Sequence, residues 1–110
     1  MAAPYVPGEV GVILDAFHIW WDPRLAEMVA RAKGRILGFH VSDWLVPLPD
    51  VLLGRGLMGD GVIDNRGLRA LVEGAGYAGP IEVEIFNQKI WNAEPEQVLM
   101  QVIERFERFV

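Results

Sequence analysis

The chain has 110 residues, of which 52% are hydrophobic, 23% charged and 10% aromatic, and this composition is typical of one globular domain with a buried core and excludes a disordered segment. Lys and Arg total 10 against 15 Asp and Glu, and the formal net charge of -5 provides no basic surface for nucleic acids or anionic membranes. The absence of cysteine excludes disulfides and thiolate metal ligands, so that a metal would have to bind His, Asp or Glu.

The N-terminal segment and the apolar runs predict neither export nor membrane insertion. Residues 1–10 contain Pro4, Pro7, Gly8 and Glu9 and lack the basic start and apolar stretch of a secretory signal. No apolar run approaches the roughly 20 residues that span a bilayer, because Gly, Pro or charged residues interrupt each one. We therefore expect a cytoplasmic protein.

Three short, β-branched apolar runs predict strands, at Glu9–Leu14, Arg35–Val41 and Ile81–Phe86. Runs of this kind are typical of strands that are buried in a parallel sheet. Helical spacing of apolar residues predicts three helices between and after them. The first helix starts at Asp22-Pro23 and buries Leu25, Met28, Val29 and Ala32; the second is capped by Asp64 or Asn65 and buries Leu68, Leu71, Val72 and Ala75; the third starts at Glu94-Pro95 and buries Val98, Leu99, Val102, Ile103, Phe106 and Phe109.

This βαβαβα order predicts an α/β fold with parallel strands and right-handed crossovers. Three strands with helices on one face leave the other face and both sheet edges uncovered, and a complete (β/α)8 barrel takes about 250 residues. We therefore predict a partial (β/α)8 TIM barrel of about three βα units, with residues 1–110 as a single incomplete domain. Its exposed edges would be covered in a homo-oligomer or by an N-terminal barrel half.

The segment between the second strand and the second helix, residues 44–61, contains two prolines and four glycines and is longer than most connections. A segment of this kind is more often functional than a spacer, and we expect it to lie over a site. Its G-x-G-x-x-G pattern at residues 54–59 does not indicate dinucleotide binding, because the preceding residues form a poor strand and Gly61 delays the helix.

Polar side chains come at the ends of all three predicted strands. Asp15 follows the first strand and His40 lies near the end of the second, at the edge where active sites form in α/β barrels. In the third strand the two-residue period places Glu82 and Glu84 on one face, either inside the barrel or in an outward face of salt bridges. Asp15, His40 and Glu84 together supply the oxygen and nitrogen ligands that a divalent ion prefers.

Four segments carry a resemblance to a known family. They are G-V-I-L-D-A-F-H at 11–18, F-H-V-S-D-W at 39–44, R-G-L-M-G-D-G-V-I-D at 55–64, and G-Y-A-G-P-I-E-V-E-I-F at 76–86. In this order they resemble the C-terminal portion, roughly the sixth to eighth βα units, of the sugar phosphate isomerases and epimerases with a xylose isomerase-like TIM barrel.

The resemblance implies that Asp15, His40 and Glu84 are metal ligands for Mn, Mg, Zn or Co, and that His18 contacts the substrate. It also implies that Glu84 is one of two glutamates that transfer a proton at a sugar carbon through an enediolate, the second coming from an earlier strand. Arg55 either contacts a substrate oxygen or phosphate or caps a carbonyl in its Gly-rich turn. Asp43 either orients a ligand or the loop, or caps a turn.

The sequence thus favours a metal-dependent isomerase or epimerase that acts on a small sugar or sugar phosphate. The alternative is a catalytically incompetent fragment or short homologue that persists as an oligomer. A nuclease built on the same barrel is disfavoured by the acidic net charge. Four tryptophans, at 20, 21, 44 and 91, follow strand ends and form either an apolar wall for a sugar ring or packing contacts.

Overall fold

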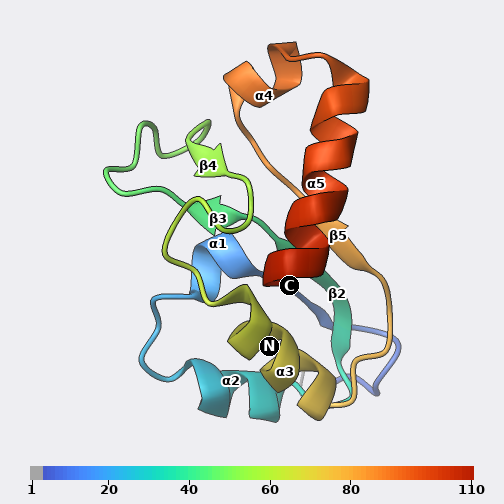
Figure 1. Cartoon of the computed structure of the whole chain (residues 1–110). Coiled ribbons are helices and arrows are strands. Elements are labelled where there is room, and N and C mark those ends of the chain that lie inside the picture. The colour runs from blue at the N-terminus through green and yellow to red at the C-terminus, as the bar shows by residue number, and fades with distance from the viewer. Residues whose placement is uncertain (1–3) are drawn as a thin grey trace.

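The structure, a computed structural model, describes residues 4–110, and the first three residues of the N-terminal segment discussed above lie outside it. Its centre is a three-stranded parallel sheet of β1 (Val12–Asp15), β2 (Ile36–Val41) and β5 (Ile81–Val83), in the order β1-β2-β5 (Figure 1). Each crossover between these parallel strands contains a helix, as such connections usually do. The predicted α/β fold, part of a (β/α)8 barrel, is confirmed.

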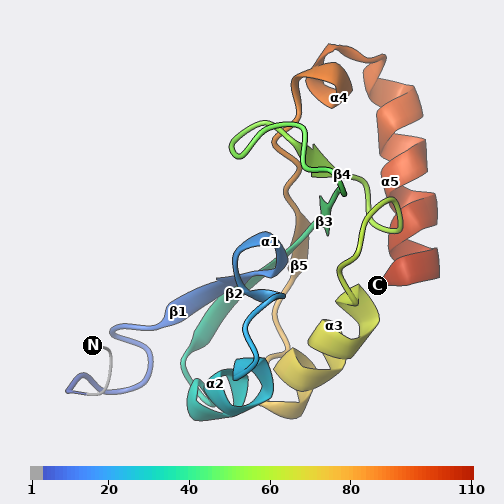
Figure 2. The same cartoon turned by 90° about the vertical axis from the view of Figure 1, so that its left-hand side faces the viewer.

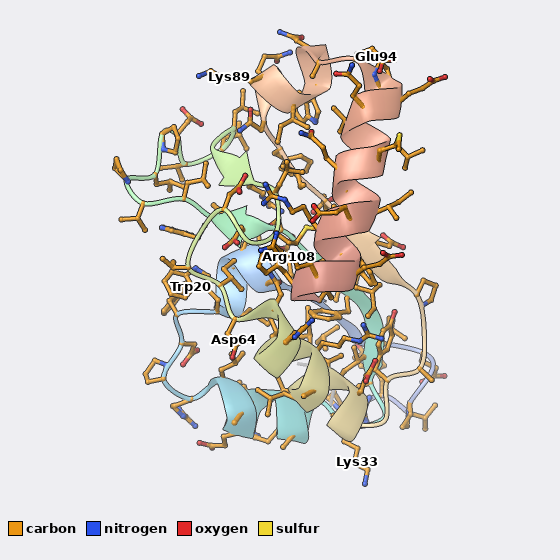
Figure 3. All side chains as sticks on the ribbon, in the orientation of Figure 1. Trp20, Lys33, Asp64, Lys89, Glu94 and Arg108 are labelled. Atoms are coloured by element: carbon orange, nitrogen blue, oxygen red, sulfur yellow. The ribbon has the colours of Figure 1, made fainter. Side chains whose placement is uncertain are left out.

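The three predicted helices are present as α2 (Leu25–Arg31), α3 (Asn65–Gly74) and α5 (Pro95–Phe109). The first begins at Leu25 rather than at Asp22-Pro23, and Met28, which was expected to be buried, is exposed. Figure 2 shows α3 and α5 on the same side of the sheet. The side chains of Asp64 and Glu94, labelled in Figure 3 at the starts of α3 and α5, accept hydrogen bonds from backbone N–H groups of the first turn. These caps satisfy donors that have no partner within the helix.

The register of the strands sorts their side chains between two faces. Leu14 pairs with Phe39, and Val41 pairs with Val83, on the face that packs against the helices. Asp15 pairs with His40, and His40 with Glu82, on the opposite face. Because side chains alternate along a strand, the apolar core and the polar cluster lie on opposite sides of the same sheet. This arrangement confirms the predicted separation of Glu82 and Glu84 from Ile81 and Val83.

All three predicted strands extend beyond the observed ones, the second only by Arg35, and the pairing explains the two larger differences. The first was expected over Glu9–Leu14, but β1 begins at Val12, which pairs with Ile36 at the start of β2. The third was expected to reach Phe86, but β5 ends at Val83, which pairs with Val41 at the end of β2. A hydrophobic run continues as a ladder only while the neighbouring strand offers backbone partners.

The segment over residues 44–61 is ordered by a short antiparallel pair, β3 (Asp43–Trp44) and β4 (Arg55–Gly56). Asp43 is fully buried and accepts hydrogen bonds from the backbone N–H groups of Trp44, Gly59 and Ile63, at 2.9, 2.8 and 2.9 Å. The carboxylate of Asp43 therefore binds backbone groups at both the start and the end of this loop. Asp43 makes the contacts of a residue that orients the loop, one of the roles expected for it.

The apolar face predicted for α5 is wrong at two positions. Val98, Val102, Phe106 and Phe109 are partly buried, but Leu99 and Ile103 are exposed. The helix lies beside β5, which is an edge strand of the sheet in residues 4–110, so nothing in that range covers Leu99 and Ile103 on the outer part of the apolar face of α5.

Two short helices, α1 (Ala16–Ile19) and α4 (Gln88–Asn92), were not predicted. Within residues 4–110, no helix combines the length and apolar character needed to cross a membrane.

Candidate functional site

Three strand ends bring an aspartate, a histidine and a glutamate together. Asp15 is the last residue of β1, His40 is the penultimate residue of β2, and Glu84 follows the last residue of β5. Each offers one ligand atom, and these atoms all lie within 4.8 Å of one another. Parallel strands end at the same edge of a sheet, which is why residues 69 positions apart at the extremes (84 − 15) meet here.

Asp15 divides its carboxylate between two tasks. Its Oδ1 accepts a hydrogen bond of 2.9 Å from the backbone N–H of Phe17 and so caps α1 directly after the strand. Its Oδ2 faces the cluster, 3.9 Å from His40 Nδ1. The cap fixes the rotation of the carboxylate, so that only one oxygen points toward the other two residues.

His40 is the centre of the cluster. Its Nδ1 lies 3.2 Å from Glu84 Oε2, and its Nε2 lies 3.1 Å from Glu82 Oε2. The side chains of His40 and Asp15 are 17% and 12% exposed, against 35% for Glu84. The site is therefore partly shielded on the side of β1 and β2 and open toward Glu84.

Arg55 joins the cluster from the long loop, and its side chain is only 4% exposed. Its Nη1 donates to Asp15 Oδ2 at 3.0 Å and lies 3.4 Å from Glu84 Oε2. Its guanidinium also lies over the rings of Phe17 and Phe86, with the central carbon 4.6 Å from each ring centroid. A buried arginine needs such ionic and aromatic partners, because an unpaired charge away from water is costly.

The backbone of Arg55 is held as firmly as its side chain. Its N–H donates to the carbonyl of Phe86 at 3.2 Å, and its own carbonyl accepts from Asn87 Nδ2 at 2.9 Å. These two hydrogen bonds hold the loop against Phe86 and Asn87, in the segment that follows β5. The expectation that this segment lies over a site agrees with the position of Arg55, although its expected contact with a substrate stays a prediction.

His18 lies at the exposed rim of the site, on α1. Its Nε2 is 3.2 Å from Arg55 Nη2. A guanidinium can only donate hydrogen bonds, so Nε2 of His18 would be the acceptor in this contact. His18 therefore contacts Arg55, which in turn contacts Asp15 and Glu84. The expected contact of His18 with the substrate stays a prediction.

Two features of the site were not foreseen. The first is Glu82, which was placed on the inner face but given no role, and which contacts His40. The second is the aromatic pair Phe17 and Phe86 around Arg55. Alternation along the third run did place Phe86 on the same face as Glu84, and this was the available signal.

The four tryptophans do not line the polar cluster together. Trp44 stacks on Phe17, with ring centroids 4.7 Å apart, and Trp20 lies 5.7 Å from Trp44 in a tilted arrangement. Trp21 and Trp91 are exposed. Trp20 and Trp44 therefore make packing contacts behind Arg55 and Phe17, which is one of the two roles expected for them.

Comparison with known proteins places this geometry in a family. The model of the xylose isomerase-like TIM barrel family matches residues 6–109. Curated proteins give no match. Among solved structures, protein SMc04130 from Sinorhizobium meliloti 1021 is 46% identical with a TM-score of 0.91, over 98% of this chain and 40% of that one.

Two further solved structures share the fold. The IolI protein, solved with a binding zinc atom, is 21% identical with a TM-score of 0.76, over 92% of this chain and 37% of that one. A fusion protein of a xylose isomerase-like TIM barrel and a 4-hydroxyphenylpyruvate dioxygenase is 27% identical with a TM-score of 0.72, over 86% of this chain and 16% of that one. The chain thus spans about two fifths of the length of the first two structures. The chain belongs to the xylose isomerase-like TIM barrel family.

Proposed function

We propose that the chain contributes the metal site and one acid/base residue to a metal-dependent isomerase or epimerase of sugars or sugar phosphates. The observation that carries the proposal is the convergence of ligand atoms from Asp15, His40 and Glu84 within 4.8 Å at the ends of three parallel strands. Two carboxylate oxygens and an imidazole nitrogen suit a divalent ion such as Mn, Mg, Zn or Co. The IolI protein, which shares the fold, was solved with a binding zinc atom, and this supports a metal at the site proposed here.

The surroundings of the three residues fit such an ion. Asp15 Oδ1 is used by the helix cap, so the oxygen that would bind the ion is Oδ2, which accepts from Arg55 Nη1 at 3.0 Å. The two carboxylates carry two negative charges, and Arg55 supplies one compensating positive charge within 3.4 Å. A divalent ion when bound would stabilise negative charge on a substrate oxygen as a Lewis acid.

Glu84 is the residue that we assign to proton transfer. It is the most exposed of the three ligands, so its carboxylate is open to a substrate. A carboxylate close to a hydroxyl-bearing carbon next to a carbonyl can take the proton of that carbon, becoming a carboxylic acid and leaving the substrate as an enediolate. Epimerisation also needs a second acid/base residue on the opposite side of that carbon, and Glu82 cannot serve because it comes from the same strand and contacts the far nitrogen of His40.

Calorimetric titration with zinc tests the metal site directly. Wild-type protein is expected to bind one zinc ion, His40→Ala to lose most of the affinity, and His18→Ala to retain the stoichiometry, because His18 contacts Arg55 rather than the three ligands. Equal isotherms for wild type and His40→Ala would exclude the site. An absence of zinc binding by the folded wild type would favour the alternative of a catalytically incompetent homologue.

The proton transfer has its own readout in deuterated water. Wild-type protein with metal is expected to exchange the substrate proton of a ketose for deuterium, and Glu84→Gln, which keeps the shape but loses the basic oxygen, is expected to slow this by about 100-fold or more. Exchange does not require the second acid/base residue, so it reports on Glu84 alone. Undiminished exchange by Glu84→Gln would remove Glu84 from the mechanism.

A further inference from the structure

The two ring nitrogens of His40 face different carboxylates. Nδ1 points to the cluster of Asp15 and Glu84, at 3.9 and 3.2 Å, whereas Nε2 lies 3.1 Å from Glu82 Oε2. We infer that Glu82 is a positioning residue that accepts the hydrogen of His40 Nε2 and thereby presents the lone pair of Nδ1 to the metal. This inference rests on the metal site proposed above.

The contact between Glu82 and His40 follows from the sheet itself. His40 and Glu82 are paired residues of β2 and β5, so their side chains leave the sheet side by side on the same face. Glu84 lies two residues further and reaches the other edge of the same ring. The E-x-E spacing therefore places one carboxylate at each nitrogen of a single histidine.

A carboxylate at one ring nitrogen of His40 decides which of the two nitrogens can bind a metal. A neutral ring carries one hydrogen, and the nitrogen that binds a metal must be the one without it. A carboxylate at the other nitrogen fixes the tautomer and the ring orientation and makes the ligating nitrogen more basic. With Glu82 at Nε2, the ligating nitrogen is Nδ1, which is the one that faces Asp15 and Glu84.

Glu82 does not fit the role of a fourth ligand. Among the residues of the described chain, the group of ligand atoms within 4.8 Å comprises Asp15, His40 and Glu84. Glu82 approaches the nitrogen on the other side of the ring. Its side chain is also 65% exposed, and an exposed ion pair adds little to folding stability. Loss of Glu82 is therefore expected to affect zinc affinity rather than the fold.

Three variants separate these effects in a zinc titration. Glu82→Ala removes the acceptor and is expected to weaken zinc binding by about 10 to 100-fold, the usual cost of losing such a partner. Glu82→Gln keeps an amide oxygen as acceptor without the charge and is expected to lose less. Glu107→Ala removes one negative charge from an exposed position on α5, outside the cluster of Asp15, His40, Glu82 and Glu84, and is expected to bind as wild type does.

The ring nitrogens can be observed by NMR of protein with nitrogen-15-labelled histidine. The chain has only two histidines, and His18→Gln assigns the signals of His40. In zinc-loaded wild type, we expect the Nδ1 signal to shift on metal binding and Nε2 to carry a hydrogen that exchanges slowly with water. In Glu82→Ala this hydrogen is expected to exchange faster, which a merely structural role for Glu82 would not predict.

The outcomes distinguish this inference from the proposed function. If wild type does not bind zinc, the proposed metal site fails and the inference with it. If wild type binds zinc and Glu82→Ala binds it equally well, the metal site stands and the role of Glu82 is overturned. Zinc on Nε2 of wild-type His40, or equal losses in Glu82→Gln and Glu82→Ala, would also overturn it. If Glu82→Ala does not fold, the role of Glu82 is still tested by two measurements: the NMR spectrum of wild type, which shows the nitrogen of His40 that binds zinc, and the zinc affinity of Glu82→Gln.

Discussion

Arg55 supplies the positive charge that partly compensates the carboxylates of the site. It is the cation that contacts both Asp15 and Glu84, and its side chain is almost completely buried between two aromatic rings. Removal of one partner from a buried ion pair usually costs about 3 to 5 kcal/mol, because the remaining charge has no compensation. The carboxylates of Asp15 and Glu84 are also the proposed oxygen ligands of the metal, so Arg55 and the ion would both neutralise the same two negative charges.

Replacement of Arg55 by Met is therefore expected to lower the free energy of unfolding by about 3 kcal/mol. Zinc is expected to recover part of this loss, because it neutralises the same carboxylates, so the rise in Tm on adding zinc should be larger for Arg55→Met than for wild type. Thermal unfolding with and without zinc measures both effects.

Arg69→Met is the matched control for this substitution. Arg69 pairs with Glu73 on the surface of α3 at 2.8 Å, and an exposed pair of this kind contributes about 0.5 kcal/mol. Its zinc response should equal that of wild type. A loss in Arg55→Met no larger than in Arg69→Met would show that the ion pairs of Arg55 contribute little to stability.

Single residues at strand ends could be recognised from the sequence, whereas their contacts could not. Asp15 and His40 stand out in the sequence because they lie at the ends of apolar strands, and Glu84 because alternation places it on the inner face of the third strand; the structure brings the three together. The contact of Glu82 with the second nitrogen of His40 depends on the pairing of β2 with β5, which joins residues 42 positions apart (82 − 40). Alternation assigns a face to a residue, but only the register identifies its neighbour.

At the scale of elements, the loop between β2 and α3 depends on Asp43. Its Oδ1 accepts from Trp44 and Ile63, and its Oδ2 from Gly59, all by backbone N–H groups. In Asp43→Asn one oxygen of this buried side chain becomes an NH2 group that faces a backbone donor, and that N–H loses its acceptor. The expected loss is about 2 kcal/mol in the free energy of unfolding, measured by urea denaturation.

Asp50 provides the control within the same loop. Its Oδ1 also accepts two backbone hydrogen bonds, from Leu52 and Leu53, but the residue is exposed, so water can replace them. Asp50→Asn should therefore destabilise less than Asp43→Asn. Equal losses would contradict the role given to burial of Asp43.

The effect of Asp50 should also depend on pH. The hydrogen bonds from Leu53 and Leu52 lower the pKa of Asp50 from its ordinary value of 3.8. A carboxyl whose pKa is lowered by folding stabilises the protein above that ordinary value and loses this contribution as pH falls through the lower, folded one. The difference in Tm between wild type and Asp50→Asn is thus expected at pH 6 and should shrink below about pH 3.8.

The order and type of the main elements followed from the sequence, but their ends did not. Caps such as Asp64 and Glu94 are local signals, and the helices start where these residues predict. The strands end where their partners end, which is information from a distant part of the chain. The short α1 was missed because Asp15 acts both as the end of a strand and as a helix cap.

At the scale of the whole molecule, both edges of the parallel sheet are bordered by apolar grooves. A groove of about 480 Å³ lies between β1 and α2 and is lined by residues such as Ile13, Leu25 and Met28. A second, of about 400 Å³, lies beside β5 and α5 and includes Ile85 and Leu99. Unpaired strand edges beside apolar side chains are a template for pairing with another chain.

We therefore expect the 110-residue chain, prepared by itself, to associate in solution. Light scattering is expected to give a mass above the 12.3 kDa of one chain. Ile13→Lys places a charge in the groove beside β1 and is expected to lower the average mass, with little change in Tm because Ile13 is exposed. A monodisperse 12.3 kDa species with a cooperative thermal transition would contradict the expectation.

Met100→Lys separates the groove from general surface hydrophobicity. Met100 is exposed on α5 but does not line either groove, so its replacement adds the same charge without reaching an uncovered sheet edge. It should leave the mass as in wild type. An equal decrease in mass for Ile13→Lys and Met100→Lys would attribute association to general surface hydrophobicity, since each variant replaces one exposed apolar side chain by lysine and changes the formal net charge from -5 to -4. A decrease for Ile13→Lys alone would assign the contact to the edge of β1, where a parallel barrel places its next strand.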